Sequence, residues 1–202
     1  PVAQSWGAFV RLGALLLLFT MPWNALNVHY GELVLFRLPS DLLADSTREK
    51  FAQALIAQKI EQQPDNAFWQ RALGDLQQSR KHYREAITAY ERALTLEPDN
   101  ATTLNNLAWV LLTADDPGLL DPERALSLAR QAAGRQPAGH ILDTLATAYW
   151  ASGRPRQAIR IEKQAMEEDP ANRDFYRAQI KKFTEQRWPG PKNHPREPGG
   201  TS

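Results

Sequence analysis

The stretch from residue 64 to residue 100 reads PDNAFWQRALGDLQQSRKHYREAITAYERALTLEPDN, and its first three letters return as its last three. Pro64 and Pro98 are therefore 34 residues apart, and Ala52 and Ala86 show the same spacing. A fixed period of this size is typical of stacked supersecondary units. Because proline does not continue a helix, the two prolines mark the limits of one unit, which we expect to contain two antiparallel helices.

Two further units follow the first one, although their lengths differ. The second unit is longer by five residues, which fall in the loop TADDPGLLDPE at 113–123, where Asp, Pro and Gly are typical of a connection between helices. The third unit loses one residue between Pro137 and Leu145. Three full units are therefore predicted, which is about the number that a stack needs to bury its apolar faces.

Small residues recur where the two helices of a unit are expected to face each other. A small side chain at such a position lets two helices approach closely, whereas a bulky one pushes them apart. In the first helices these residues are Gly74, Ala108 and Ala146, and in the second helices they are Ala86, Ala125 and Ala158.

This pattern resembles the tetratricopeptide repeat, and the resemblance covers about residues 67–169. The first unit carries the family signature almost completely, in Leu73, Gly74, Ala86, Tyr90, Ala93 and Pro98. Two departures are notable, because Gln77 replaces the aromatic residue of the first helix and Glu162 replaces that of the third unit's second helix. The resemblance implies an all-α solenoid of about three helix-turn-helix units with flanking helices.

Helices are also predicted on both sides of the three units. Residues 47–63 have the pattern of a single second helix that packs through Ala52, Leu55 and Ile56. Residues 173–187 are expected to form an amphipathic capping helix, because a terminal repeat needs a polar outer face.

In that capping helix, Phe175, Ile180 and Phe183 are expected to face inwards, while Lys181, Lys182 and Arg187 face solvent. The repeat domain with its cap is therefore predicted at 47–187. The tail at 188–202 is rich in Pro and Gly, and we expect it to be disordered.

The N-terminal part of the chain has a different character. Residues 12–26 read LGALLLLFTMPWNAL, and no charged residue lies between Arg11 and Glu32. With the residues before it, this stretch approaches the roughly 20 residues that cross a bilayer, so a membrane anchor is predicted at 1–30. A cleaved signal peptide and a buried helix of the soluble domain are the alternatives, although MPWNALN offers no good cleavage site.

Residues 31–46 are expected to link the anchor to the repeats. The apolar run GELVLFRL within them is either an interfacial segment, a lone strand, a docking patch or a segment that packs on the first repeat helix. Positive charge is nearly balanced on the two sides of the anchor, with Arg11 before it and Arg37 after it. The membrane orientation that we predict has the N-terminus inside the cytoplasm and the repeats outside it. The expected location is a bacterial inner membrane, crossed once, with periplasmic repeats.

The composition argues against several classes of function. A net charge of +1 provides no strong field to attract nucleic acid, and the lack of cysteine excludes disulfides and thiol nucleophiles. The sequence contains no Gly-rich phosphate loop, no Gly-x-Ser-x-Gly and no His-Glu-x-x-His, and its four histidines are scattered. We therefore expect a protein that is not an enzyme, with no cofactor, metal, small-molecule substrate or nucleic-acid partner.

The resemblance implies that the first helices line a concave groove, into which the second, fifth, ninth and twelfth residues of each unit point. These residues are Phe68, Arg71, Asp75, Gln78, Thr102, Asn105, Trp109, Leu112, His140, Asp143, Thr147 and Trp150. Large aromatic rings beside Arg, Asp and Asn suit an extended peptide or a partner helix. For Trp109 and Trp150, packing inside the repeats is the alternative.

One specialised binding mode does not fit the sequence. The subclass of these repeats that binds chaperone tails holds a terminal carboxylate with asparagines and cations. Asn106 and Arg71 stand at two of those places, but Asp75 replaces an asparagine, and His140 and Thr144 occupy the other cationic positions. A clamp for a terminal carboxylate is therefore not expected.

These observations predict a membrane-anchored scaffold that binds a protein partner in its groove, in the assembly or maturation of a membrane or envelope complex. Two alternatives stay open. In the first, the chain is an integral structural subunit of a larger membrane complex. In the second, it is an accessory repeat domain of a membrane enzyme.

Overall fold

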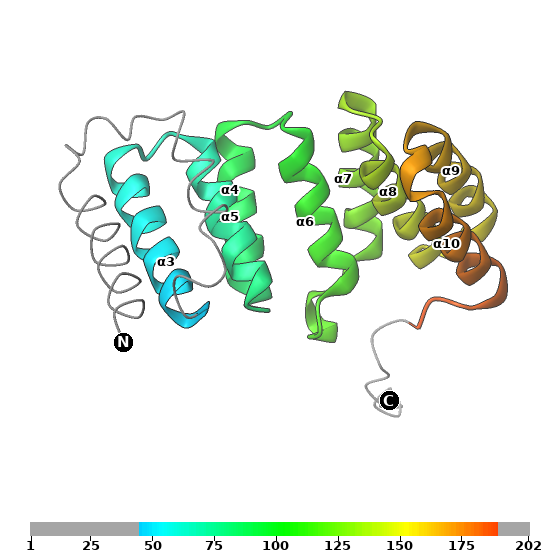
Figure 1. The fold of residues 1–202 in the computed structure, drawn as a ribbon, viewed down its shortest axis with the longest axis horizontal. Coiled ribbons are helices and arrows are strands. Elements are labelled where there is room, and N and C mark those ends of the chain that lie inside the picture. The colour runs from blue at the N-terminus through cyan, green and yellow to red at the C-terminus, as the bar shows by residue number, and fades with distance from the viewer. Residues whose placement is uncertain (1–44, 190–202) are drawn as a thin grey trace, which may run out of the picture. The chain divides into compact units, whose positions relative to one another are not determined.

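The computed structural model describes residues 45–189, all of whose regular elements are helical (Figure 1). Within this range no helix has both the length and the apolar character of a membrane span. The predicted anchor at 1–30, nearly all of the linker and most of the tail lie outside the described residues. The α-helices are α3 (Asp45–Gln62), α4 (Ala67–Ser79), α5 (Tyr83–Leu96), α6 (Ala101–Thr113), α7 (Pro122–Arg135), α8 (Gly139–Ala151), α9 (Pro155–Glu168) and α10 (Arg173–Glu185).

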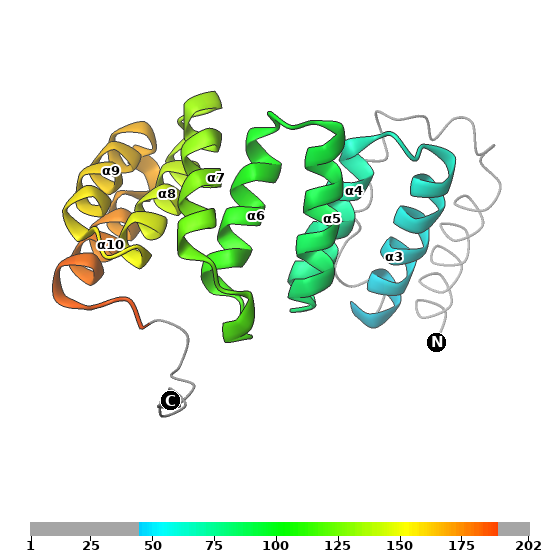
Figure 2. The ribbon, with the colours of Figure 1, turned by 180° about the vertical axis from the view of Figure 1, so that it is seen from behind.

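The helices from α4 onwards form the predicted repeats. They belong to the second of the two compact units into which the chain divides, Gln53–Ser202. Helix α4 packs on α5, α6 on α7, and α8 on α9, and these pairs follow one another in chain order (Figures 1 and 2). Since α6 also contacts α4 and α8, the first helices of the three pairs form a continuous row.

The recurring Pro-Asp-Asn run marks the start of a first helix because its asparagine caps that helix. The side chain of Asn66 accepts a hydrogen bond from the backbone N–H of Phe68, and that of Asn100 accepts one from the N–H of Thr103, both at 3.0 Å. Such bonds satisfy N–H groups that have no partner in the first turn of a helix. The third unit has Ala138 at this position and lacks the side-chain cap.

The small residues predicted to lie between paired helices are buried. Ala86, Ala108, Ala125, Ala146 and Ala158 are fully buried. Gly74 lies under the ring of Tyr90, where an added Cβ atom would be 2.5 Å from two ring carbons. Glycine at this position therefore allows a large aromatic side chain of α5 to close over α4.

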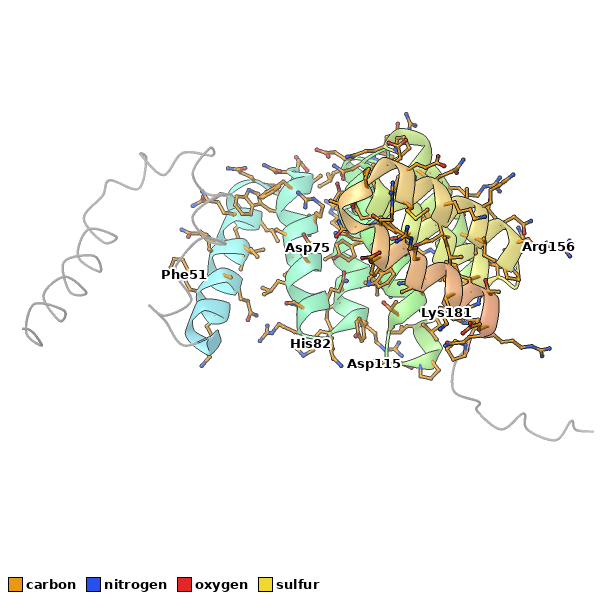
Figure 3. The ribbon with its side chains drawn as sticks, turned by 45° about the vertical axis from the view of Figure 1, so that its right-hand side comes forward. Phe51, Asp75, His82, Asp115, Arg156 and Lys181 are labelled. Atoms are coloured by element: carbon orange, nitrogen blue, oxygen red, sulfur yellow. The ribbon has the colours of Figure 1, made fainter. Side chains whose placement is uncertain are left out.

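The longer loop of the second repeat reaches back to the first repeat. It contains a short 3-10 helix, Pro117–Leu119. The loop also brings the carboxylates of Asp115 and Asp116 to the turn between α4 and α5, where Figure 3 labels His82 and Asp115. Asp115 pairs with Lys81 at 3.0 Å, and Asp116 pairs with Arg84 at 2.7 Å. The N–H of Gly118, together with Arg84, lowers the pKa of Asp116. The inserted residues thus connect neighbouring repeats at the surface.

Helix α10 caps the stack with Phe183 facing inwards as predicted, but the prediction fails at Phe175. Phe175, expected to point inwards, has 48% of its surface exposed, whereas Tyr176 and Phe183 are buried at 2% and 1%. Tyr176 and Phe183 are seven residues apart, which places them on one face of a helix, and Phe175 lies about 100° away from Tyr176. The inward position of Phe175 was therefore a wrong prediction.

Candidate functional site

The twelve residues predicted to line the groove differ widely in exposure. We call the surface that they define on α4, α6 and α8 the A-helix face. Partly exposed residues on it are Phe68, Arg71, Asp75, Gln78 and Trp109, and exposed residues are Thr102 and His140. The buried ones are Asn105, Leu112, Asp143, Thr147 and Trp150. The open part of the face therefore belongs mainly to the first two repeats.

Asp75 is the centre of a hydrogen-bond network that joins three helices. The hydroxyl of Tyr90 in α5 donates to Oδ1 of Asp75 at 2.7 Å, and Nδ2 of Asn106 in α6 donates to the same oxygen at 2.9 Å. Oδ2 of Asp75 lies 3.4 Å from a guanidinium nitrogen of Arg71. Burial raises the pKa of Tyr90, and the neighbouring Asp75 carboxylate raises it further, so this phenol stays a donor.

Next to this network, α4 presents an aromatic ring and a guanidinium group together. The guanidinium carbon of Arg71 lies 5.1 Å from the ring centroid of Phe68, within the range of a cation–π contact. The edge of Trp69 meets the Phe68 ring at a centroid distance of 4.8 Å, and the Trp69 indole N–H donates to Gln63 at 3.3 Å. These contacts hold Phe68 in place while leaving part of it exposed.

The second repeat adds an indole ring and an amide. Trp109 is partly exposed and makes no ring contact within residues 45–189. Asn105 is 8% exposed, and its Nδ2 lies 3.4 Å from Oδ1 of Asn106. Because Asn105 is buried, the part of the second repeat that a peptide can contact is the partly exposed Trp109 ring, which supplies apolar contact area.

In the third repeat, the corresponding surface is covered by the chain itself. Trp150 is 3% exposed, and its ring centroid lies 5.3 Å from that of Phe183 and 5.2 Å from that of Trp188. The ammonium group of Lys182 lies 4.8 Å above the same indole. Trp150 is therefore packed among the repeats and the residues that follow them, as the alternative interpretation of this tryptophan anticipated.

The third repeat also contains two buried carboxyl groups that no ion pair satisfies. Glu162 is fully buried, and Asp143 on the A-helix face is 7% exposed. Both carboxyl oxygens of Glu162 and Oδ1 of Asp143 have no N–H or O–H donor in the part of the chain that the structure describes, apart from a proton that one of the two carboxyl groups can share with the other.

Burial raises the pKa of both groups, and the proximity of Asp143 raises that of Glu162 further. The departure of Glu162 from the repeat signature was the one sequence feature that singled out this position. Nothing in the sequence indicated that Asp143 would be its neighbour.

Comparisons with known proteins agree with this architecture. A family model described as tetratricopeptide repeat matches residues 40–177. No curated protein matches the chain. Among solved structures, it is similar to PilW, described as a widely conserved type IV pilus biogenesis factor, with a TM-score of 0.57 and 16% identity over 70% of this chain and 72% of that one.

A second similar structure is TTC0263, a thermophilic tetratricopeptide protein of Thermus thermophilus. Its TM-score is 0.54, with 16% identity over 69% of this chain and 72% of that one. Identities this low bear on the fold alone, whereas the family model covers more than half of the sequence. The chain therefore belongs to the tetratricopeptide repeat family.

Proposed function

We propose that this protein is a scaffold that binds a protein partner on the open part of the A-helix face, over α4 and α6. Tetratricopeptide domains bind protein partners in general and mostly serve as scaffolds rather than enzymes. The observation that carries the proposal is the network around Asp75. It holds Arg71 and Asp75 of the first repeat and Asn106 of the second in fixed positions while leaving them partly exposed.

The partner that suits this surface is an extended peptide or a single helix. Phe68 on α4 and Trp109 on α6 supply partly exposed aromatic area, and Arg71, Asp75 and Asn106 add donors and acceptors on the same two helices. Rigid aromatic anchors with ordered polar groups are the usual source of binding energy and orientation in such interfaces.

We further propose that residues 1–30 anchor the scaffold in a bacterial inner membrane, with the repeats on the periplasmic side. The support is the uncharged apolar sequence between Arg11 and Glu32. A role in assembling or maturing a membrane or envelope complex accords with the description of PilW as a pilus biogenesis factor. The alternative is that the chain is a structural subunit of such a complex.

Crosslinking followed by capture from native membranes tests the binding surface. The wild type is compared with a Phe68→Ala, Trp109→Ala double variant, with helicity checked by circular dichroism. Phe175→Ala is the matched control, because it removes an exposed ring on α10 that is not one of the twelve residues of the A-helix face. Loss of one prominent partner in the double variant alone is expected, and an unchanged set of partners would contradict the proposal.

Membrane extraction tests the anchor. Leu16→Arg and Leu17→Arg together place two charges in the middle of the apolar run. Since each charge at the centre of a span costs about 2.5 to 3.5 kcal/mol on insertion scales, the variant is expected to leave the carbonate-resistant membrane fraction. Equal retention of wild type and variant would exclude a spanning anchor in this stretch.

A further inference from the structure

The chain that leaves α10 does not run directly into solvent. The helix ends at Glu185, and the next residue, Gln186, has an extended backbone with φ −117° and ψ 153°. We call residues 186–189 the return segment. Pro189 disfavours a helical conformation at Trp188, directly before it, so the helix does not resume within this segment.

The return segment is bound to Trp150 by two different contacts. The indole N–H of Trp150 donates a hydrogen bond to the main-chain carbonyl of Gln186 at 3.2 Å. Two residues further on, the ring of Trp188 meets Trp150 edge to face, with an interplanar angle of 89°. A side-chain donor on a main-chain carbonyl together with a pocket for a nearby side chain is how receptors hold an extended peptide.

The capping of the repeats does not depend on these contacts. Tyr176 and Phe183 already cover the end of the stack from within α10. Tyr176 packs with Leu142 and Ala165, and its hydroxyl donates to Asp169 at 2.9 Å. The return segment therefore adds a second layer, in which Trp188 packs at the edge of the cluster that contains Trp150 and Phe183.

This second layer is held less firmly than a closed core. The indole N–H of Trp188 is buried and has no partner within the described residues. An unpaired buried donor costs free energy, which offsets part of the gain from stacking the two indoles. When Trp188 is displaced, its indole N–H can hydrogen-bond to water, which lowers the free-energy cost of displacement. A competing segment can therefore replace the return segment.

We infer that the return segment is an internal ligand of the A-helix face, which closes the third repeat at Trp150 until a partner segment displaces it. The competing segment has the same chemistry, namely an extended backbone with an aromatic side chain two residues after the carbonyl that Trp150 binds. The blocking of a partner rests on the proposed function, whereas the binding of the segment to Trp150 does not.

A peptide added in trans tests the binding without any partner. The probe is a fluorescein-labelled peptide with the sequence of residues 185–194, EQRWPGPKNH. The receptors are the full-length chain with Trp188→Ala and the full-length chain with Trp188→Leu. The leucine variant keeps apolar volume over Trp150 and so preserves a folded receptor if the alanine variant does not.

Fluorescence anisotropy is expected to show binding to at least one of these variants, and much weaker binding to the wild type. The reason is that a tethered segment competes at an effective concentration in the millimolar range. The same peptide with alanine at its tryptophan position serves as the control and should not bind. Absence of binding to both folded variants at millimolar peptide would overturn the inference.

The blocking of a partner is tested by crosslinking in native membranes. Trp188→Ala is expected to capture severalfold more of the partner than the wild type, while Phe175→Ala on the exposed side of α10 captures the same amount. Equal capture by Trp188→Ala and the wild type would overturn the closing role. If no variant captures any partner while the peptide still binds in trans, the proposed function fails and the internal ligand stands.

Discussion

The ring of Tyr90 in α5 lies so close to Gly74 in α4 that a Cβ atom on the glycine would be 2.5 Å from two of its carbons. The far end of the same side chain donates a hydrogen bond to Asp75, the next residue along α4. One aromatic residue therefore sets both the distance between the paired helices and the position of a charged group on the A-helix face.

Gly74→Ala is expected to destabilise the protein. Overpacking against the Tyr90 ring costs about 1 to 3 kcal/mol, which exceeds the gain of about 1 kcal/mol from removing a glycine inside a helix. Gly134→Ala in α7 is the control, since an added Cβ atom there meets nothing within 4 Å, and it should be neutral or stabilising. Urea unfolding measures both, and equal stability of the two variants would contradict the packing argument.

Tyr90→Phe keeps the ring and removes the hydroxyl that bonds Asp75. We expect a loss of about 1 to 2 kcal/mol in the free energy of unfolding, because a hydrogen bond to a carboxylate is replaced only partly by water. Tyr83→Phe in the same helix is the control, since its hydroxyl makes no hydrogen bond in the described part of the chain, and it should change stability by less than about 0.5 kcal/mol. An equally small loss in the free energy of unfolding for Tyr90→Phe would show that the hydrogen-bond network around Asp75 contributes little to stability.

Gly139→Ala is expected to loosen α10 locally. An added Cβ atom would lie 2.5 Å from the Tyr176 hydroxyl oxygen and 2.7 Å from Cβ of Asp169, so the contact between the start of α8 and α10 must open. Amide hydrogen exchange should become faster in Arg173–Glu185 and stay unchanged in α4 and α5, because stability is local in repeat proteins. An exchange pattern identical to that of the wild type would refute this role of Gly139.

The buried pair of Asp143 and Glu162 predicts an unusual dependence of stability on pH. Because burial raises the carboxyl pKa values in the folded protein, the folded state keeps a proton that the unfolded chain releases near pH 4 to 5. The free energy of unfolding must then fall as pH rises from that range through the raised pKa of the pair. The cation that faces the pair is Lys182, from α10.

Glu162→Gln removes the carboxyl group whose protonation makes stability depend on pH. Its stability should resemble that of the wild type at about pH 5 and exceed it at about pH 8, where the wild type bears the cost of a buried charge. Asp174→Asn is the control, since this carboxylate on α10 is 94% exposed, and its pH profile should be parallel to that of the wild type. Unfolding profiles of equal slope for Glu162→Gln and the wild type would rule out the pair as their cause.

The repeat architecture was predictable because its signals are local. Proline punctuation, small residues at a fixed spacing and the longer loop at 113–123 each act within one unit. The structure confirms the three helix pairs, and it adds that the asparagine of the Pro-Asp-Asn run is a helix cap. The inward face of α10 was predicted wrongly at Phe175, because Tyr176 next to it satisfies the same sequence pattern.

The candidate site was predictable as a set of positions and not as a surface. The repeat numbering placed Asp75 and Trp109 on the same face as Asp143 and Trp150, but it carried no information on which would be covered. Trp150 is covered by Trp188, which lies 38 positions later in the sequence. Contacts at such separations depend on the path of the chain after α10, and no periodic pattern reports that path.

By itself, then, the sequence determined that this chain folds into three helix pairs, where each pair begins and ends, and which small residues lie between the helices. The reason is that helix periodicity, capping and close packing within a repeat involve residues near one another in the chain. Only the tertiary structure decided that Asp75 joins three helices, that Asp143 meets Glu162, and that the chain's own end covers Trp150. These features arise from burial and contact between distant residues, whose free energy depends on the complete stack.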